Sequence, residues 1–590
     1  MAATDAAERA QGERRAPQHA AAVAENAQPQ ASAAAHADGE SVQTAAGQHA
    51  ANAAARDDAQ AADTGEEVAK STMLMSVATL GSRATGLIRT WAMAFALGNG
   101  LLTSAYQVAN NMPNVVYELV AGGLLGAAFI PVYLLQKEKF GPDGGNRFAN
   151  NLLNLTIVVL GVLSILATVF APQVIATQTF TVGDTAEVTQ RSVEFFRIFA
   201  IQIVFYGIGG IVTALLNANR VYFLPSLAPA LNNVVVIVSF FAYIPLSHVD
   251  SELAILVLAV GTTLGVAVQF AIQLPALAKQ GFKFRPSIDL HDPALIEALK
   301  IAVPTFIYIV GTMVSYSCRN AFSLQAGDNG PSTLIYAWTW YQLPHGVVAV
   351  SLSRALFTEM SDSMAKGDLK SLRHHVKAGI GGTFLLIIPM AGIMGALSVP
   401  IMQIFQAGAF DADDVRTVAG VLTLWVVSMP FYSTLMYLYN VYASIRKFMV
   451  FAGVSTVMVV VQCALYAVLC NAQVMGLAGV PVADFVYYTA CCVILLVILR
   501  RFIGSFGMRS IVWTFVRTLA ATAIAVAATA GLNVLIPLHD GIVSGLIHLV
   551  VCGGVGLVAA YALCYLFRVP ETAVISRLLN KLKGRRGQSA

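Results

Sequence analysis

Arginines stand inside apolar stretches of this chain, where a charged side chain is costly to place. Arg83 and Arg89 lie in the segment Ser82-Arg-Ala-Thr-Gly-Leu-Ile-Arg89, within the first apolar run. A charge at the centre of a bilayer costs at least about 2.5–3.5 kcal/mol, so both side chains are expected to face protein or water. A guanidinium group keeps its charge and binds phosphate through paired hydrogen bonds. The pair therefore indicates a polar cavity that receives an anion; the alternative is two arginines bound to helix-end carbonyls.

The spacing of these two arginines matters for that interpretation. Six residues apart on a regular helix, they point in directions about 120° apart. Gly86 stands between them and permits a bend, because glycine tolerates unusual backbone conformations. A bend at Gly86 is therefore expected to turn both arginines towards one cavity.

A proline with polar neighbours interrupts the second apolar run and again the eighth. Pro113 and Pro344 each remove a backbone hydrogen bond and bend a helix, and nearby polar side chains satisfy the freed groups in a wet cavity. Transporters often build a mid-membrane site from broken helices at a repeat interface. The residues that we expect to line this cavity are Asn110, Asn114 and Glu118 in the second run, and Gln342, His345 and Arg354 in the eighth. His345 by itself is more typical of a hydrogen-bonded interior histidine than of a proton carrier.

The elements that position these residues follow from composition. The chain has 590 residues, 57% of them hydrophobic and 12% charged, against about 25% charged residues in soluble domains. This excludes a soluble globular protein, and the long apolar runs exclude a barrel of alternating strands. We predict an all-α polytopic membrane protein with about fourteen transmembrane helices. The expected spans are 71–98, 104–136, 149–172, 194–217, 225–246, 252–278, 293–325, 332–362, 378–406, 417–444, 448–471, 476–499, 511–537 and 542–567.

The distribution of Lys and Arg predicts the orientation of these spans. With the N-terminus in the cytoplasm, the cytoplasmic connections and the C-terminal tail carry 22 Lys and Arg residues, and the opposite connections carry only Arg191 and Arg416. Basic residues are retained on the cytoplasmic side. Both termini are therefore expected in the cytoplasm, and the helix number is even.

Other functional classes find little support in the sequence. The net charge of +4 is too small to indicate nucleic-acid binding. The seven cysteines lie in apolar runs without paired metal-ligand spacing, so neither a metal site nor a cofactor is expected. No extracytoplasmic connection is long enough for a catalytic domain, which argues against a membrane enzyme acting on a lipid-linked sugar. A non-transporting scaffold would have no need for charges buried at a cost.

The polar motifs also resemble a known family. Gly81-Ser-Arg83-x-x-Gly86-x-x-Arg89, Met112-Pro113-Asn114 and Gly122-Gly123 followed by Phe129-x-Pro131 are similar to the MurJ (MviN) lipid II flippases, and Leu343-Pro344-x-Gly346 is similar to the eighth helix of that family. The family belongs to the multidrug/oligosaccharidyl-lipid/polysaccharide exporter (MOP) superfamily. The chain looks most like its actinobacterial members.

The resemblance implies two six-helix lobes with pseudo-two-fold symmetry around a central cavity, plus two C-terminal helices that form a groove for a lipid tail. On this basis we expect a polar Ala-rich cytoplasmic tail at 1–68, lobes at 69–278 and 279–503, groove helices at 504–567 and a basic cytoplasmic tail at 568–590. The composition of 1–68 by itself predicts disorder.

The resemblance further implies transport of lipid II, an undecaprenyl-diphosphate-linked peptidoglycan precursor, from the inner to the outer leaflet of the bacterial cytoplasmic membrane by alternating access. Arg83 and Arg89 match family arginines that bind diphosphate. Two other family arginines are replaced by Tyr117 and Thr339, which leads to the hypothesis that Arg319 and Arg354 supply the missing charge. The expected partners are lipid II, membrane lipids and either a coupling ion (Na⁺ or H⁺) or the membrane potential. The alternative is another MOP exporter, for a different lipid-linked glycan or a cationic drug, and an acidic cavity around Glu118 and Asp484 would favour the cation.

Overall fold

Helices form nearly all of the structure. The computed structural model describes residues 78–79, 81–118, 129–183, 185–537, 539 and 541–572, without the side chains of 116–118, 301, 302 and 304. Within these ranges the chain contains helices and no strands, so the predicted all-α class is confirmed. The expected disordered tail at 1–68 and most of the basic tail at 568–590 lie outside the described residues.

The helices follow one another with short connections. After a first helix over residues 81–97 come α2 (Leu101–Glu118), α3 (Ile130–Val169), α4 (Ala171–Thr179), α5 (Glu187–Phe199), α6 (Gln202–Ala218), α7 (Phe223–Ser247), α8 (Ser251–Ala271), α9 (Leu274–Lys279), α10 (Pro293–Ala326), α11 (Gly330–Pro344), the π-helical turn η2 (His345–Ala349), α12 (Val350–Ala365), α13 (Leu369–Ala396), α14 (Ser398–Gln403), α15 (Ala412–Trp425), the 3₁₀ turn η3 (Val426–Ser428), α16 (Met429–Ser444), α17 (Phe448–Leu469), α18 (Gly479–Ile503), α19 (Met508–Leu535), α20 (Ile542–His548), the π-helical turn η5 (Leu549–Gly553) and α21 (Gly554–Leu566).

Length and apolarity show that the chain is a multi-pass membrane protein. Among the described residues, nine helices are long and apolar enough to cross a membrane, or up to eleven when two bent pairs are each counted as one span. The remaining expected spans correspond to the helix at 81–97, to α2, and to α11 with α12. These three carry Arg83, Asn110 and Gln342 with their polar neighbours. The spans that do not meet the length and apolarity expected of a membrane helix are therefore the ones that carry most of the candidate site.

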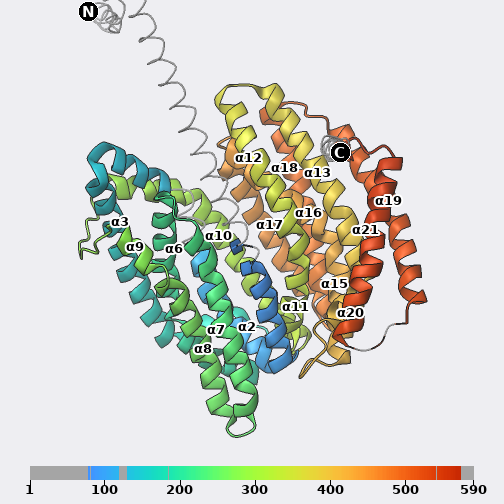
Figure 1. The fold of residues 1–590 in the computed structure, drawn as a ribbon, viewed down its shortest axis with the longest axis horizontal. Helices are drawn as coiled ribbons and strands as arrows, with labels where there is room; N and C mark the ends of the chain where they lie inside the picture. Colours follow the sequence, from blue (N-terminus) through green and yellow to red (C-terminus); the bar gives the residue numbers. More distant parts are fainter. Residues whose placement is uncertain are drawn as a thin grey trace, which may run out of the picture. The chain divides into compact units, whose positions relative to one another are not determined.

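The helices before and after the connection at 280–292 pack mainly among themselves. α2, α3, α5, α6, α7 and α8 contact one another, as do α10, α13, α16, α17 and α18. In Figure 1 the first set lies on one side of the molecule and the second on the other, with α11 between them. Contacts of α2 with α11, and of α3 and α4 with α10, join the two sets.

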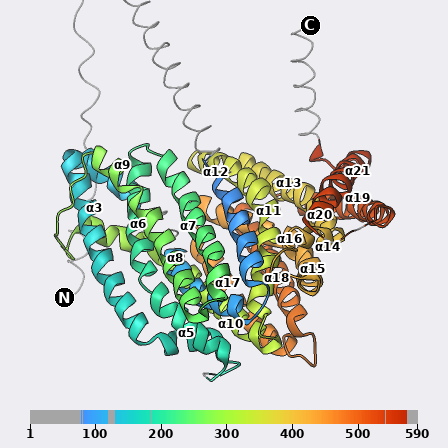
Figure 2. The ribbon, with the colours of Figure 1, turned by 60° about the horizontal axis from the view of Figure 1, so that its bottom comes forward.

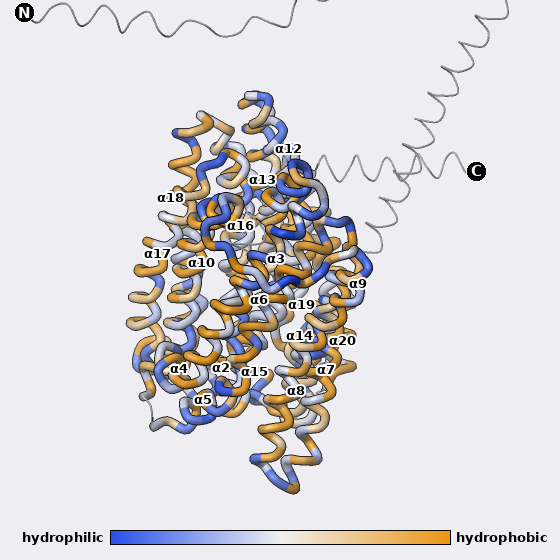
Figure 3. Tube along the Cα trace, turned by 90° about the vertical axis from the view of Figure 1, so that its left-hand side faces the viewer, coloured by the Kyte–Doolittle hydropathy of each residue, from blue (hydrophilic) through white to orange (hydrophobic). Residues whose placement is uncertain are grey.

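The last two spans lie at one edge. α19 packs on α13, and α21 packs on α19; Figure 2 shows this pair apart from the helices of the first set. Small residues permit the close approach: a β-carbon added at Gly392 of α13 would come within 2.6 Å of Thr522 Cγ2 of α19. Figure 3 shows hydrophilic residues gathered towards the helix ends and apolar residues between them.

Three asparagines of α3 form hydrogen bonds with the backbone of the connection at 280–292, which joins the two sets of helices. The side chain of Asn150 accepts from the Arg285 N–H (2.8 Å) and donates to the Lys283 carbonyl (3.0 Å), and Asn151 makes the same pair of bonds with the Asp289 backbone (both 2.8 Å). Asn154 donates to the Arg285 carbonyl at 2.7 Å. These buried amides satisfy backbone groups that have no helical partner, as buried polar groups require. The extended connection is therefore fastened to α3.

Candidate functional site

Arg83 on the first helix lies against a residue of η2. A β-carbon added at Gly346 in η2 would overlap the Arg83 guanidinium, so this arginine lies directly against the π-helical turn. The opposite face of the helix packs on α7, where Asn233 Nδ2 donates to Thr85 Oγ1 at 3.1 Å. Arg83 therefore points towards η2, away from α7.

Gly86 does not bend the helix, contrary to expectation. The chain is helical without interruption from 81 to 97, and a β-carbon at Gly86 would lie 3.6 Å from Asn233 Nδ2. The glycine thus permits close packing against α7. As a result Arg83 and Arg89 point in different directions: Arg89 lies within electrostatic range of the Tyr106 hydroxyl on α2.

Neither arginine is neutralised within the described part of the chain. Arg83 is exposed and Arg89 half-buried, and neither forms a hydrogen bond or an ion pair with a described residue. Within the described ranges, no helix-end carbonyl accepts a hydrogen bond from either arginine, which does not support the alternative that they bind such carbonyls. With respect to the described residues, two guanidinium groups are therefore unpaired and available for an anion.

The break at Pro344 is confirmed, whereas Pro113 causes none. α11 ends at Pro344 and continues as the π-helical turn η2, a distortion frequent at functional sites. α2 continues through Pro113 to Glu118, and the Asn114 amide donates to the Asn110 carbonyl at 2.7 Å.

The other polar candidates differ in how far they are buried and in their hydrogen-bond partners. The Glu118 side chain and Gly122-Gly123 lie outside the described residues. Gln342 is exposed. His345 is buried, its Nδ1 lies 3.1 Å from Ser433 Oγ, and its ring lies against Tyr432 in a tilted arrangement with ring centroids 4.7 Å apart. It is therefore a hydrogen-bonded interior histidine.

Arg319 differs from Arg83 because it has a counter-ion. Its Nη2 lies 3.0 Å from Asp484 Oδ2 on α18, and its Nε donates to the Tyr466 hydroxyl of α17 at 3.3 Å. Asp484 is fully buried and also accepts from Trp425 Nε1 (2.9 Å), Gln462 Nε2 (2.7 Å) and the Tyr466 hydroxyl. Asp484 thus balances the charge of Arg319 in this conformation, and the hypothesis that Arg319 supplies the charge of a missing family arginine stays a prediction.

Arg354 remains a candidate for anion binding. It is exposed on α12 and has no ion-pair partner within the described ranges. It lies nine residues beyond His345 along η2 and α12, and its role in anion binding stays a prediction.

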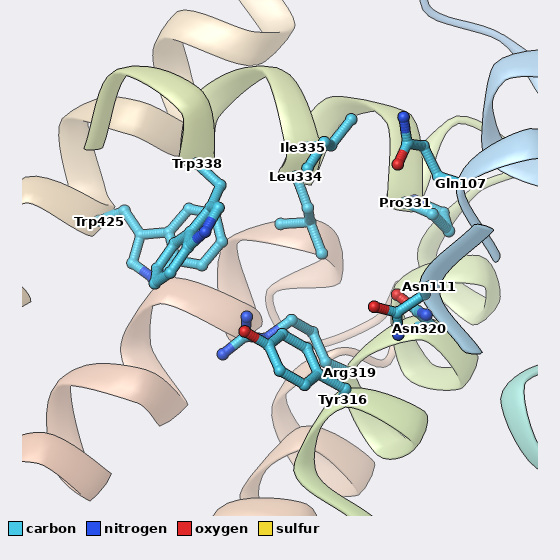
Figure 4. A pocket seen from close by; sticks show the side chains of 10 residues that line it. All are labelled: Gln107, Asn111, Tyr316, Arg319, Asn320, Pro331, Leu334, Ile335, Trp338 and Trp425. Atoms are coloured by element: carbon cyan, nitrogen blue, oxygen red, sulfur yellow. The ribbon is translucent and has the colours of Figure 1, made fainter. Parts of the chain in front are cut away.

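A small cavity opens beside Arg319. It measures about 80 Å³, and Figure 4 shows the guanidinium group near Trp338 and Trp425, with the amides of Asn111 and Asn320 towards the other end. The Arg319 Cζ lies 5.3–5.6 Å from the ring centroids of Tyr316, Trp338 and Trp425. Sequence reasoning missed this aromatic enclosure; opposite charges in two apolar runs, at Arg319 and Asp484, were the available signal.

A buried polar cluster joins the two sets of helices near the first residues of α2 and α11. Asn99 Nδ2 donates to Thr333 Oγ1 (2.9 Å), Ser332 Oγ donates to Asn99 Oδ1 (2.5 Å), and the Ser332 N–H donates to Ser104 Oγ (3.3 Å). We call Asn99, Ser104, Ser332 and Thr333 the latch. It joins the start of α2 to the start of α11 and was not predicted from the sequence.

The fold defines a class of protein, an all-α polytopic membrane protein. A solved structure described as the lipid II flippase MurJ in an inward closed conformation superposes with a TM-score of 0.68, covering 83% of this chain and 98% of that one at 21% identity. An inward-facing multidrug resistance MATE transporter of the MOP superfamily superposes with a TM-score of 0.56 at 13% identity, covering 74% of this chain and 95% of that one.

The sequence comparison narrows the class to a family. The model of the family described as lipid II flippase MurJ matches residues 93–551, and the chain belongs to this family. A relative in Rhizobium meliloti, named a probable lipid II flippase MurJ, is 28% identical over 64% of this chain and 71% of its own length.

Proposed function

We propose that this protein is a lipid II flippase, which carries the undecaprenyl-diphosphate-linked headgroup from the cytoplasmic to the outer leaflet by alternating access. Membership of the MurJ family and the names of its relatives support this function. A diphosphate-sugar headgroup cannot cross hydrocarbon unaided, so a polar path must replace its hydration. The family is one of transporters, so transport rather than catalysis is the activity to test.

The observation that carries the proposal is the unpaired Arg83 guanidinium against Gly346 of η2. It lies between the first helix and α11, where a headgroup would pass between the two sets of helices. Arg83 and Arg89 would bind the diphosphate, with Arg354 as a further cation. Asn110, Asn114, Glu118, Gln342 and His345 would face the sugars and peptide.

The orientation follows from the basic connections. We infer that both termini lie in the cytoplasm of a bacterium and that the spans cross its cytoplasmic membrane. The latch then lies at the outer end, and this conformation is closed to the outside. The cycle would draw energy from the membrane potential or from a coupling Na⁺ or H⁺.

Export of a cationic drug has less support. Asp484, one of the two acids that would favour a cation, is paired with Arg319 and saturated by hydrogen bonds. The unpaired charges near η2 and α2 are positive. The cavity therefore suits an anion.

Replacement of Arg83 or Arg89 by Ala tests the proposal. Each variant is expected to lose complementation of a flippase-depleted strain at unchanged membrane abundance, because the diphosphate would lose a charge-assisted partner. Arg416→Ala is the matched control, since Arg416 is exposed and pairs only with Asp413 three residues away. Normal growth of both the Arg83 and Arg89 variants would refute the assigned roles.

A further inference from the structure

The cavity beside Arg319 contains two hydrogen-bond donors without partners. Arg319 uses Nε and Nη2 for Tyr466 and Asp484, which leaves Nη1 without a bond to any described residue. Asn111 Nδ2 is buried and has no partner among the described residues. Both side chains line the same cavity. Buried donors such as Asn111 Nδ2 normally have a partner, so this amide, with the unbonded Arg319 Nη1 in the same cavity, indicates a ligand that accepts hydrogen bonds.

The guanidinium group is held in a fixed position. Arg319 is 8% exposed, and Asp484 on α18 and Tyr466 on α17 fix two of its nitrogens. Asp484 itself is oriented by Trp425 and Gln462. The free edge of the guanidinium is thus presented to the cavity by a rigid support, which lowers the entropic cost of binding a ligand.

The size of the cavity limits the ligand. A volume of about 80 Å³ holds roughly five water-sized groups, which suits a carboxylate with the peptide group before it and not a sugar ring. Trp338 also stacks on Tyr341 at 4.9 Å and lies 5.2 Å from Trp425, so its ring is engaged by other aromatic side chains. A small anionic end of a chain fits better than a saccharide.

The cavity lies at a different depth from Arg83. Arg319 is seven residues before the end of α10 at Ala326, about 10 Å along the helix axis. Arg83 is fourteen residues before the end of its helix at Leu97, about 21 Å along that axis. Pro331, which lines the cavity, is the neighbour of Ser332 in the latch. The Arg319 cavity therefore lies beside the latch, and Arg319 is nearer to the end of its helix than Arg83 is to the end of its own.

We propose that the Arg319 cavity is a subsite for the terminal carboxylate of the peptide on the transported headgroup, with Arg319 Nη1 facing the carboxylate and Asn111 Nδ2 facing the peptide carbonyl before it. This inference rests on the proposed function. The diphosphate is attached to the lipid and stays at the level of Arg83, while the peptide at the far end of the headgroup reaches the closed end. Asp484 is the positioning residue that orients the guanidinium.

Binding of two probes to the purified full-length protein in nanodiscs tests the subsite. The probes are lipid II and the same molecule with its terminal carboxylate converted to a carboxamide. The wild type is expected to bind the carboxylate form about tenfold more tightly, the range for a hydrogen bond to a charged group. The double variant Arg319→Gln/Asp484→Asn, which leaves no unpaired buried charge, is expected to bind both probes equally. Asn111→Leu is expected to weaken binding of both probes, because both retain the preceding carbonyl.

The controls separate this inference from the proposed function. Arg83→Ala should weaken the binding of both probes by the same factor, and Arg416→Gln should leave the affinity for both probes unchanged. Equal binding of the two probes by the wild type, or an unchanged preference in the double variant, would overturn the subsite alone. Failure of the wild type to bind either probe would overturn the flippase proposal together with the subsite.

Discussion

At the scale of single residues, the ion pair of Arg319 and Asp484 combines charge with complete hydrogen bonding of the carboxylate. Both oxygens of Asp484 accept two donors each, from Arg319 and Trp425 at Oδ2 and from Gln462 and Tyr466 at Oδ1. A buried pair is costly to desolvate, and removal of one partner leaves an uncompensated charge. Substitution of one partner is therefore expected to destabilise the protein, whereas substitution of both partners should destabilise it much less.

Arg319→Gln alone is expected to destabilise the protein by about 3–5 kcal/mol, because Asp484 would remain buried without a counter-ion. The double variant Arg319→Gln/Asp484→Asn should recover most of this loss, since an amide pair carries no charge. Thermal unfolding in detergent, followed by tryptophan fluorescence, measures both. Equal destabilisation by the single and the double variant would contradict the ion-pair argument.

At the scale of elements, the connection between α9 and α10 depends on α3. Asn150, Asn151 and Asn154 occupy one stretch of α3 and bind the backbone of Lys283, Arg285 and Asp289. The connection therefore moves with the helices of the first set. Any rotation between the two sets must then be absorbed beyond it, in α10, which bends by 50° between the segments Pro293–Lys300 and Thr305–Ala326.

Substitution of these asparagines should accelerate hydrogen exchange at individual backbone amides. Asn150→Ala is expected to accelerate hydrogen exchange at the Arg285 N–H, and Asn151→Ala at the Asp289 N–H, by about tenfold each, the equivalent of roughly 1.4 kcal/mol for one lost hydrogen bond. Each variant is the control for the other, because each should leave the other site protected. Uniform acceleration across the connection in either variant would show that the bonds do not act separately.

At the scale of the whole molecule, the latch joins the two sets of helices by hydrogen bonds. Asn99, Ser104, Ser332 and Thr333 are buried and come from the two sets of helices. Alternating access requires these contacts to break once in each cycle. The latch is built from neutral hydrogen bonds, which are individually worth only about 0.5–1.5 kcal/mol and therefore permit opening.

A cross-link across the latch should stop transport. Ser104→Cys combined with Ser332→Cys places two thiols on segments joined by the hydrogen bond from the Ser332 N–H to Ser104 Oγ (3.3 Å). Oxidation of the double variant is expected to abolish flipping of lipid II in proteoliposomes, and reductant should restore it. Ser104→Cys alone should be insensitive to oxidant. Full activity of the cross-linked protein would show that this end need not open.

Much of this protein was predictable from the sequence. Apolar runs longer than a bilayer determined an all-α membrane protein, and Arg83 in such a run indicated a polar cavity, because the cost of burying a charge is a local property of the residue and its neighbours. The break at Pro344 followed from local chemistry as well. The lobes at 69–278 and 279–503 and the diphosphate role of the arginines stay predictions.

Only the tertiary structure decided which charges are free. The sequence placed Arg319 beside Arg83 as an equivalent cation, yet Arg319 meets Asp484, 165 residues away, whereas Arg83 meets the backbone of Gly346. The sequence also predicted a bend at Gly86, where the helix continues without interruption and packs against Asn233. The energy of a charged or small residue depends on the atoms that surround it after folding, and those atoms come from helices whose order along the chain does not reveal their neighbours.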